Sequence, residues 1–113
     1  MPRDIRVKLG DNTLQRGCVI ENDEVLGRLY GNENGPTIVI MGGISASRFV
    51  ADGGRLDRGW WSTLVRPDGP IDLNKYSVIG FDFAPSIESE SRPKSITTHD
   101  QADRLKELLL FNN

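Results

Sequence analysis

The chain has 113 residues, with 14 basic and 16 acidic side chains and a formal net charge of −2. This length predicts a single domain, 1–113, with a modest hydrophobic core. Neither sign of charge forms a long block, which argues against nucleic acid and anionic membrane as partners, because both bind clustered Lys and Arg. Cys18 is the only cysteine and the first residues form no apolar targeting segment, so we expect a cytoplasmic protein.

The first predicted elements are a hairpin and a strand. The stretch GCVIENDEVLGRLYG, residues 17–31, has two apolar runs on either side of Asn22 and Asp23. This pattern predicts a β-hairpin that turns at these two residues. Residues 38–41 (Ile, Val, Ile, Met) lack polar alternation, which is typical of a strand covered on both faces in a parallel sheet.

The second half of the chain predicts another strand and a helix. Residues 42–75 show no clear periodicity, whereas YSVIGFDF, residues 76–83, is again typical of a buried strand. Thr98 and Gln101 then have the spacing of a capping box. One face of the predicted helix is apolar and carries Ala102, Leu105, Leu108 and Leu109. Two strands joined by a crossover and followed by a helix predict an α/β fold with an incomplete sheet.

The first candidate site is the turn at the end of the first buried strand, with Gly42, Gly43, Ile44 and Ser45. In open α/β sheets ligands bind at the carboxyl ends of strands, and glycines there let backbone N–H groups face a developing negative charge. A plain tight turn is the alternative, because Gly-Gly often marks one. The segment has no Lys for a phosphate loop, and no G-x-S-x-G motif presents a nucleophile.

The tryptophans, the histidine and the cysteine are further candidates for a binding or catalytic site. Trp60 and Trp61 are adjacent and cannot both point into one core from a strand, so one of them lines a cleft or packs under a loop, with pure packing as the alternative. His99 and Asp100 project about 100° apart at a helix start, which does not suit a base and its orienting carboxylate, so we expect His99 near solvent. One His and one Cys, Cys18, predict no metal site.

Four stretches resemble the N-terminal part of the homoserine O-acyltransferases: GPTIVIMGGISASRF, DRGWWSTLV, PIDLNKYSVIGFDF and SITTHDQADRLKELL. Their order and approximate spacing match that family from about Gly17 to Leu110. The resemblance implies the N-terminal portion of an α/β-hydrolase fold, with a hairpin, two buried strands and a C-terminal amphipathic helix. It also implies transfer of an acetyl or succinyl group from coenzyme A to homoserine, in methionine biosynthesis.

The resemblance implies that the turn after the first buried strand supplies half of an oxyanion hole, through the backbone N–H of Gly43 or Ile44. The family's nucleophilic serine, aspartate and histidine are expected beyond the end of this sequence, so the chain alone is expected to be inactive. Candidate residues of the substrate cleft are Gly42, Ser45, Trp60 and Trp61.

Three functions remain open at this point. In the first, a second polypeptide that carries the nucleophile completes an acyltransferase, with homoserine and acyl-coenzyme A as its substrates. In the second, the chain is a truncated, non-catalytic remnant or interaction module that self-associates through an open sheet edge at its last strand. In the third, it is part of an esterase. The segments RPDGP (66–70) and FAPSIESES (83–91) depart from the family's glycine-rich pattern, and the polar second segment raises doubt about unaltered activity.

Overall fold

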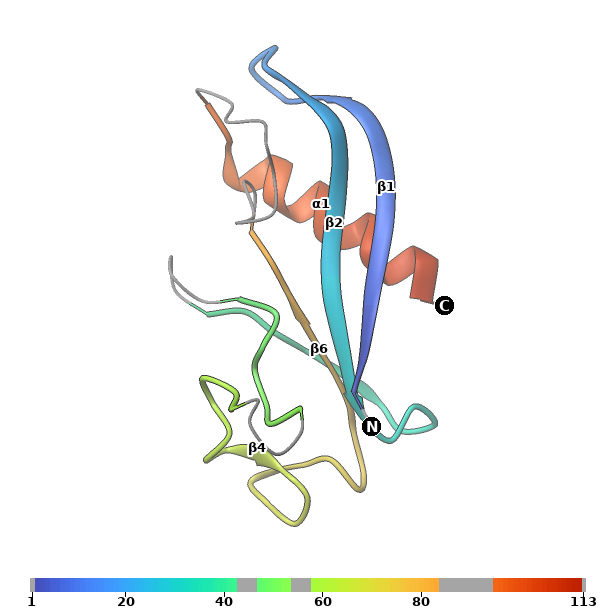
Figure 1. The fold of residues 1–113 in the computed structure, drawn as a ribbon, viewed down its shortest axis with the longest axis vertical. Helices are drawn as coiled ribbons and strands as arrows, with labels where there is room; N and C mark the ends of the chain where they lie inside the picture. The colour runs from blue at the N-terminus through green and yellow to red at the C-terminus, as the bar shows by residue number, and fades with distance from the viewer. Residues whose placement is uncertain (1, 43–46, 54–57, 84–94, 113) are drawn as a thin grey trace. The chain divides into compact units, whose positions relative to one another are not determined.

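The computed structural model describes residues 2–42, 47–53, 58–83 and 95–112. Its elements in chain order (Figure 1) are β1 (Arg3–Thr13), β2 (Val19–Gly31), β3 (Thr37–Ile40), β4 (Val65–Arg66), β5 (Ile71–Asp72), β6 (Ser77–Phe81) and α1 (Thr98–Asn112). The chain forms two compact units. Unit 1 contains Met1–Asp4 and Gly27–Phe81, and unit 2 contains Ile5–Leu26 and Asp82–Asn113. In the described ranges, no helix is long and apolar enough to cross a membrane.

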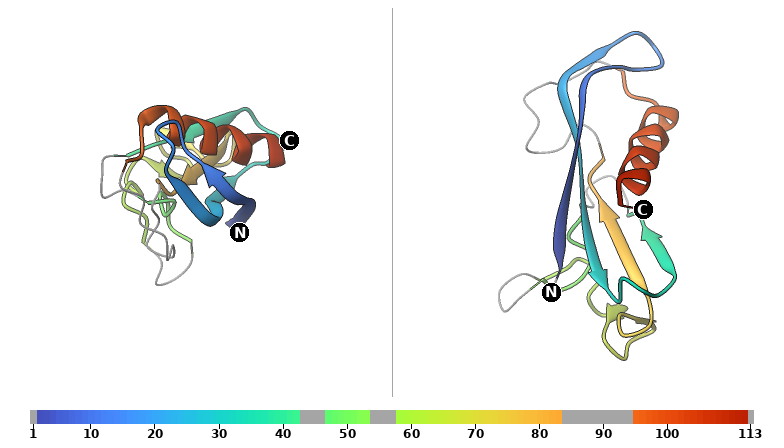
Figure 2. Two further views of the ribbon diagram at one scale, coloured as in Figure 1. Left: turned by 90° about the horizontal axis from the view of Figure 1, so that it is seen from above. Right: turned by 90° about the vertical axis from the view of Figure 1, so that its right-hand side faces the viewer.

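The main sheet has the strand order β1-β2-β6-β3, so β6 lies between two neighbours. It is antiparallel to β2 and parallel to β3, with Val78 opposite Tyr30 in β2 and Ile38 in β3. The right-hand view of Figure 2 shows β3 and β6 pointing the same way and β2 the opposite way. Every residue of β6 is buried, whereas only Ile40 of β3 is. The prediction of two parallel strands is confirmed. The prediction of an open edge at the last strand is wrong, because in the described part of the sheet the edge strands are β1 and β3.

The predicted turn at Asn22 and Asp23 is wrong. β2 continues through these residues, and the positive φ of Asn22, 49°, is a local irregularity within it. The chain turns earlier, at residues 14–18, where the Leu14 N–H donates to the carbonyl oxygen of Cys18 at 2.7 Å. β1, which precedes this turn, was not predicted because it buries only Ile5 and therefore lacks an apolar run.

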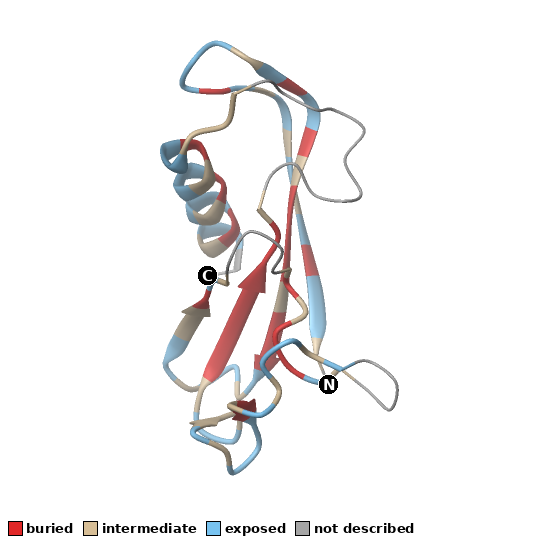
Figure 3. Ribbon diagram, turned by 90° about the vertical axis from the view of Figure 1, so that its left-hand side faces the viewer, coloured by how far each residue is buried: buried red, intermediate tan, exposed pale blue. Residues whose placement is uncertain are grey.

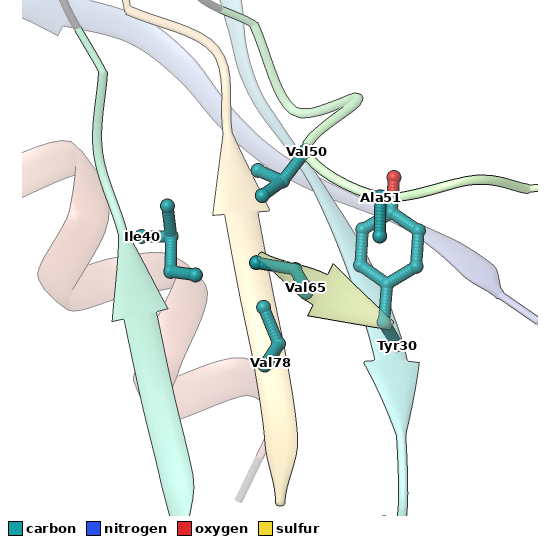
Figure 4. Packing of buried hydrophobic residues seen from close by; sticks show 6 residues of the cluster. All are labelled: Tyr30, Ile40, Val50, Ala51, Val65 and Val78. Atoms are coloured by element: carbon teal, nitrogen blue, oxygen red, sulfur yellow. The ribbon is translucent and has the colours of Figure 1, made fainter. Parts of the chain in front are cut away.

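The crossover between β3 and β6 folds onto the sheet. It contains the short parallel pair of β4 and β5, which the sequence analysis missed because two-residue strands have no period. Val50, Ala51 and Val65 of this crossover pack in one buried cluster of unit 1, which Figure 4 shows: the cluster consists of Tyr30, Ile40, Val50, Ala51, Val65 and Val78.

The helix was predicted in the right place, but its N-cap is one residue earlier. The Asp100 N–H donates to Thr97 Oγ1 at 3.2 Å, and the Thr97 N–H donates to Asp100 Oδ2 at 2.8 Å. Thr97 and Asp100 therefore form the capping box, with an aspartate at the position expected for Gln101. The Gln15 N–H also donates to Asp100 Oδ1, at 2.8 Å. These bonds tie the helix start to the turn between β1 and β2.

The buried face of α1 differs from the predicted apolar face. Buried residues recur at every fourth position: Asp100, Arg104 and Leu108. In Figure 3 the buried positions of α1, in red, lie along one side of the helix. Leu105 and Leu109 are half-buried and Ala102 is exposed. Arg104 and Asp100 can occupy the inner face because their charges have partners there.

Arg104 forms a buried, two-pronged ion pair with Asp23 of β2. Its Nε and Nη2 atoms each lie 3.1 Å from an oxygen of that carboxylate, and both side chains are at most 3% exposed. Nη2 also donates to the carbonyl oxygen of Glu24 at 2.7 Å, and Asn12 Nδ2 donates to Asp23 Oδ2 at 2.9 Å. The Arg104 guanidinium is thus held by charge-assisted bonds in the interior of unit 2.

Arg104→Met is expected to lower the free energy of unfolding by about 3–5 kcal/mol, because Asp23 is left buried without its counter-charge. Arg6→Met is the matched control: Arg6 pairs with Glu24 at 3.0 Å but is 53% exposed, so its loss costs about 1 kcal/mol or less. The double variant, Asp23→Leu with Arg104→Met, should recover most of the free energy of unfolding that Arg104→Met loses. Urea unfolding measures all three, and equal effects of the two single substitutions would contradict the role of the buried pair.

Asp100→Asn is expected to destabilise the protein by about 1–3 kcal/mol near neutral pH. Burial opposes the charge of Asp100, but hydrogen bonds from Thr97 and Gln15 outweigh it and hold its pKa below 3.8. A lowered folded pKa stabilises above the unfolded pKa, and this contribution is lost as pH falls through the folded value. Urea midpoints of the two proteins should therefore converge as pH falls below the folded pKa of Asp100. Asp103→Asn, at a 63% exposed side chain, is the control, and a pH-independent difference for Asp100→Asn would refute this account.

Candidate functional site

The predicted oxyanion turn follows β3. Gly42 is half-buried directly after Met41, while Gly43, Ile44 and Ser45 lie outside the described residues. The chain is described again from Ser47, and we call residues 47–51 the exit segment. The carbonyl groups of this segment accept hydrogen bonds from other parts of the chain, and these bonds define its position.

Tyr30 of β2 holds the middle of the exit segment. Its hydroxyl donates to the carbonyl oxygen of Arg48 at 3.3 Å, and the Val50 N–H donates to the same oxygen at 2.9 Å. Burial raises the pKa of Tyr30 above 10.0, although nearby backbone groups and Arg28 offset part of this effect. The hydroxyl therefore stays protonated and available as a donor.

The two tryptophans also hold the exit segment. The backbone N–H of Trp60 donates to the carbonyl oxygen of Phe49 at 3.0 Å, and that of Trp61 donates to Val50 at 2.9 Å. The indole Nε1 of Trp60 donates to the carbonyl oxygen of Ser47 at 2.8 Å. The two rings stack with centroids 5.7 Å apart and an interplanar angle of 17°.

The side chains of the tryptophans are not core residues. Trp60 is 40% exposed and Trp61 is 38% exposed. Neither tryptophan belongs to the buried core of the described residues, and packing stays open as the alternative. That they line a substrate cleft stays a prediction.

Two glycines permit the close approach of backbone to the exit segment. A Cβ on Gly59 would lie 2.3 Å from the carbonyl oxygen of Val50, and one on Gly80 of β6 would lie 2.5 Å from that of Arg48. No side chain fits at either distance, since both contacts are with backbone atoms. The glycine that precedes Trp60 is thus required so that the tryptophans can pair with the exit segment.

Arg48 is a site residue that the sequence analysis missed. It is 6% exposed, and its guanidinium lies 4.4 Å from the centroid of the Phe49 ring. Arg28 lies 5.2 Å from the same centroid, so two cations contact one ring. Both arginines also approach Asp4 Oδ1, Arg28 at 3.2 Å and Arg48 at 3.6 Å. A single arginine in a loop gives no sequence signal for such burial.

The remaining candidates, His99 and Cys18, are not part of this cluster. His99 is 63% exposed and its Nε2 lies 3.3 Å from Asp103 Oδ2, so its predicted place near solvent is confirmed. Asp100 caps the helix and does not orient His99. Cys18 is half-buried and packs against Leu14 and Ile20. Among the residues that the structure describes, the contacts of His99 and Cys18 include no pairing of a nucleophile with a base.

Comparison with known proteins links the whole pattern to one family by sequence. No protein-family model matches the chain. The homoserine O-succinyltransferase of Burkholderia ambifaria (strain MC40-6) is 34% identical over 90 residues, which cover 74% of this chain and 23% of the relative. The enzyme of that name from Burkholderia multivorans is 33% identical with the same coverage. The chain thus spans less than a quarter of the length of these curated relatives.

Solved structures show the same fold. The homoserine O-acetyltransferase of Staphylococcus aureus matches with a TM-score of 0.83 and 21% identity, covering 98% of this chain and 36% of that one. Esterase E22 matches with a TM-score of 0.77 and 22% identity, covering 98% and 38%. The homoserine O-acetyltransferase of Bacillus anthracis gives 0.64 and 24%, covering 89% and 30%. The mixed sheet and C-terminal helix are thus those of part of an α/β-hydrolase fold, and over 74% of its length the chain is similar in sequence to homoserine O-succinyltransferases.

Proposed function

We propose that the chain is part of an enzyme that transfers an acetyl or succinyl group from acyl-coenzyme A to homoserine, in the cytoplasm. The observation that carries this proposal is the 34% identity to a homoserine O-succinyltransferase. The fold is consistent with it, because β3 delivers Gly42 to the carboxyl end of a parallel strand. That edge is where open α/β sheets bind ligands.

In this proposal the chain supplies electrostatic stabilisation. A serine attacks the thioester carbonyl of acyl-coenzyme A, the carbonyl oxygen becomes negatively charged, and the N–H of Gly43 or Ile44 donates to it. Collapse of this intermediate expels coenzyme A and leaves an acyl-serine. The hydroxyl of homoserine then attacks the acyl-serine and forms a second intermediate that the same N–H stabilises. Collapse of this intermediate breaks the ester bond to serine, so the acylated homoserine leaves and the serine hydroxyl is restored.

In this proposal, the serine and its partner histidine and aspartate lie in the larger part of the enzyme that is outside the region matched by this chain. The chain covers 23% of its first curated relative and 36% of the Staphylococcus aureus structure, so most of the length of those proteins lies outside the matched region. Homoserine and acyl-coenzyme A would bind only to the completed protein.

Two other functions have an observation in their favour. The fold is shared with esterase E22, in which case water would attack the acyl-serine in place of homoserine. In the described part of the sheet, β3 pairs on one side only, with β6. An open edge of this kind favours self-association of a non-catalytic module.

The acyltransferase proposal is tested by mixing the chain with a polypeptide that contains the rest of the Burkholderia ambifaria relative. Continuous release of coenzyme A from succinyl- or acetyl-coenzyme A is expected only when both polypeptides and homoserine are present, whereas without homoserine the release should stop after about one equivalent, when the acyl-serine has formed. Replacing the backbone amide of Ile44 by an ester removes one N–H donor and should lower kcat by about 10²–10³-fold if that donor is used. The same replacement at Gly43 is the matched control and identifies which of the two donates.

Each alternative gives a different result in this assay. Hydrolysis of p-nitrophenyl acetate without transfer to homoserine would replace the acyltransferase by the esterase. No reaction with either substrate, together with concentration-dependent dimerisation of the chain in sedimentation experiments, would favour the interaction module. A rate unchanged by both ester replacements would refute the oxyanion role of this turn.

A further inference from the structure

We propose that Trp60 is a positioning residue whose indole N–H fixes Ser47, the first described residue after the predicted oxyanion turn. The contact itself is observed, while its catalytic consequence rests on the function proposed above. Trp60 would then act on the reaction through the backbone, without touching the substrate.

The contact has the geometry of a strong hydrogen bond. Trp60 Nε1 lies 2.8 Å from the carbonyl oxygen of Ser47, at the short end of the usual range for N–H···O bonds. The side chain remains 40% exposed, so apolar burial alone does not explain a tryptophan at this position. Its polar end has a defined partner, and its apolar body is only partly covered.

The Trp60 indole matters more for the position of Ser47 than for the positions of Phe49 and Val50. Phe49 and Val50 are tied by backbone N–H groups of Trp60 and Trp61. The hydroxyl of Ser47 accepts from the Phe49 N–H at 3.3 Å, but this bond stays within the exit segment. Among the residues that the structure describes, Trp60 Nε1 is the donor that ties Ser47 to another part of the chain.

Trp61 keeps the Trp60 ring oriented. The two rings stack at 5.7 Å and 17°, while the Trp61 backbone is bound to Val50. The described contacts of Trp61 include no hydrogen bond from its indole. The two adjacent tryptophans therefore have different tasks, which makes Trp61 the matched control for Trp60.

Ser47 follows Ile44 by three positions and Gly43 by four in the sequence. Because the chain between them is short, a fixed Ser47 is proposed to limit how far these predicted donors can move. Oxyanion donors stabilise charge only when they are held within about 0.5 Å of the right place. Release of one end of the turn is expected to lower kcat and leave KM nearly unchanged, because such donors act mainly in the transition state.

The test replaces one atom of the indole. Benzothienylalanine at position 60 has sulfur in place of the N–H and keeps the ring, and the same residue at position 61 is the control. At position 60 we expect amide hydrogen exchange at Phe49 to become about five- to tenfold faster, with exchange at Trp61 unchanged. In the completed enzyme we expect kcat to fall about tenfold with KM within about twofold.

The two readouts separate this proposal from the function on which it rests. Equal exchange at Phe49 in both variants, or equal losses of kcat in both, would overturn the role of Trp60. Faster exchange only for position 60, in a mixture whose unmodified form transfers no acyl group, would confirm the tether to Ser47 and refute the proposed function instead. Trp60→Phe, which also lacks the donor, should reproduce the exchange result.

Discussion

The double pairing of β6 is the constraint on which unit 1 depends. This strand has hydrogen-bonded neighbours on both edges, β2 and β3, and all five of its residues are buried. The exit segment reaches it at Gly80, where a Cβ would lie 2.5 Å from the carbonyl oxygen of Arg48. A strand bonded on two edges and covered on its faces cannot shift its register without breaking both ladders. The segment that follows the predicted oxyanion turn is therefore built against the least movable strand of the unit.

Unit 2 relies on charge in its interior. α1 turns Asp100 and Arg104 inward, and the partners of these two residues come from the turn after β1 and from β2. Buried ion pairs are costly to desolvate, so they favour one arrangement over others more than they add to stability. The helix can satisfy both groups only in the rotation that also buries Leu108. Its more apolar residues, Leu105 and Leu109, stay half-buried as a result.

Sequence reasoning found the elements whose burial is two-sided or whose termini carry a cap, and missed the rest for identifiable reasons. The apolar run of β6 and the polar signals near Thr97 are local, so the strand and the helix were predicted, with the cap displaced by one residue. β1 has one buried residue, Ile5, and β2 continues through an Asn-Asp pair that usually marks a turn. Burial of Arg48 and Arg104 depends on partners 44 and 81 positions away, Asp4 and Asp23. No local pattern reports such a pairing.

Each residue of the Gly-Trp-Trp sequence, 59–61, has its own structural role. In the sequence alone, the motif contributed to a resemblance. In the structure Gly59 allows backbone within 2.3 Å of where its Cβ would be, Trp60 donates through its indole, and Trp61 stacks on that ring. None of these tasks can be exchanged among the three positions, because one needs the absence of a side chain and another needs a donor at the far end of a large one. A substitution in this motif is therefore best judged by the task of its position, and the two tryptophans are not equivalent.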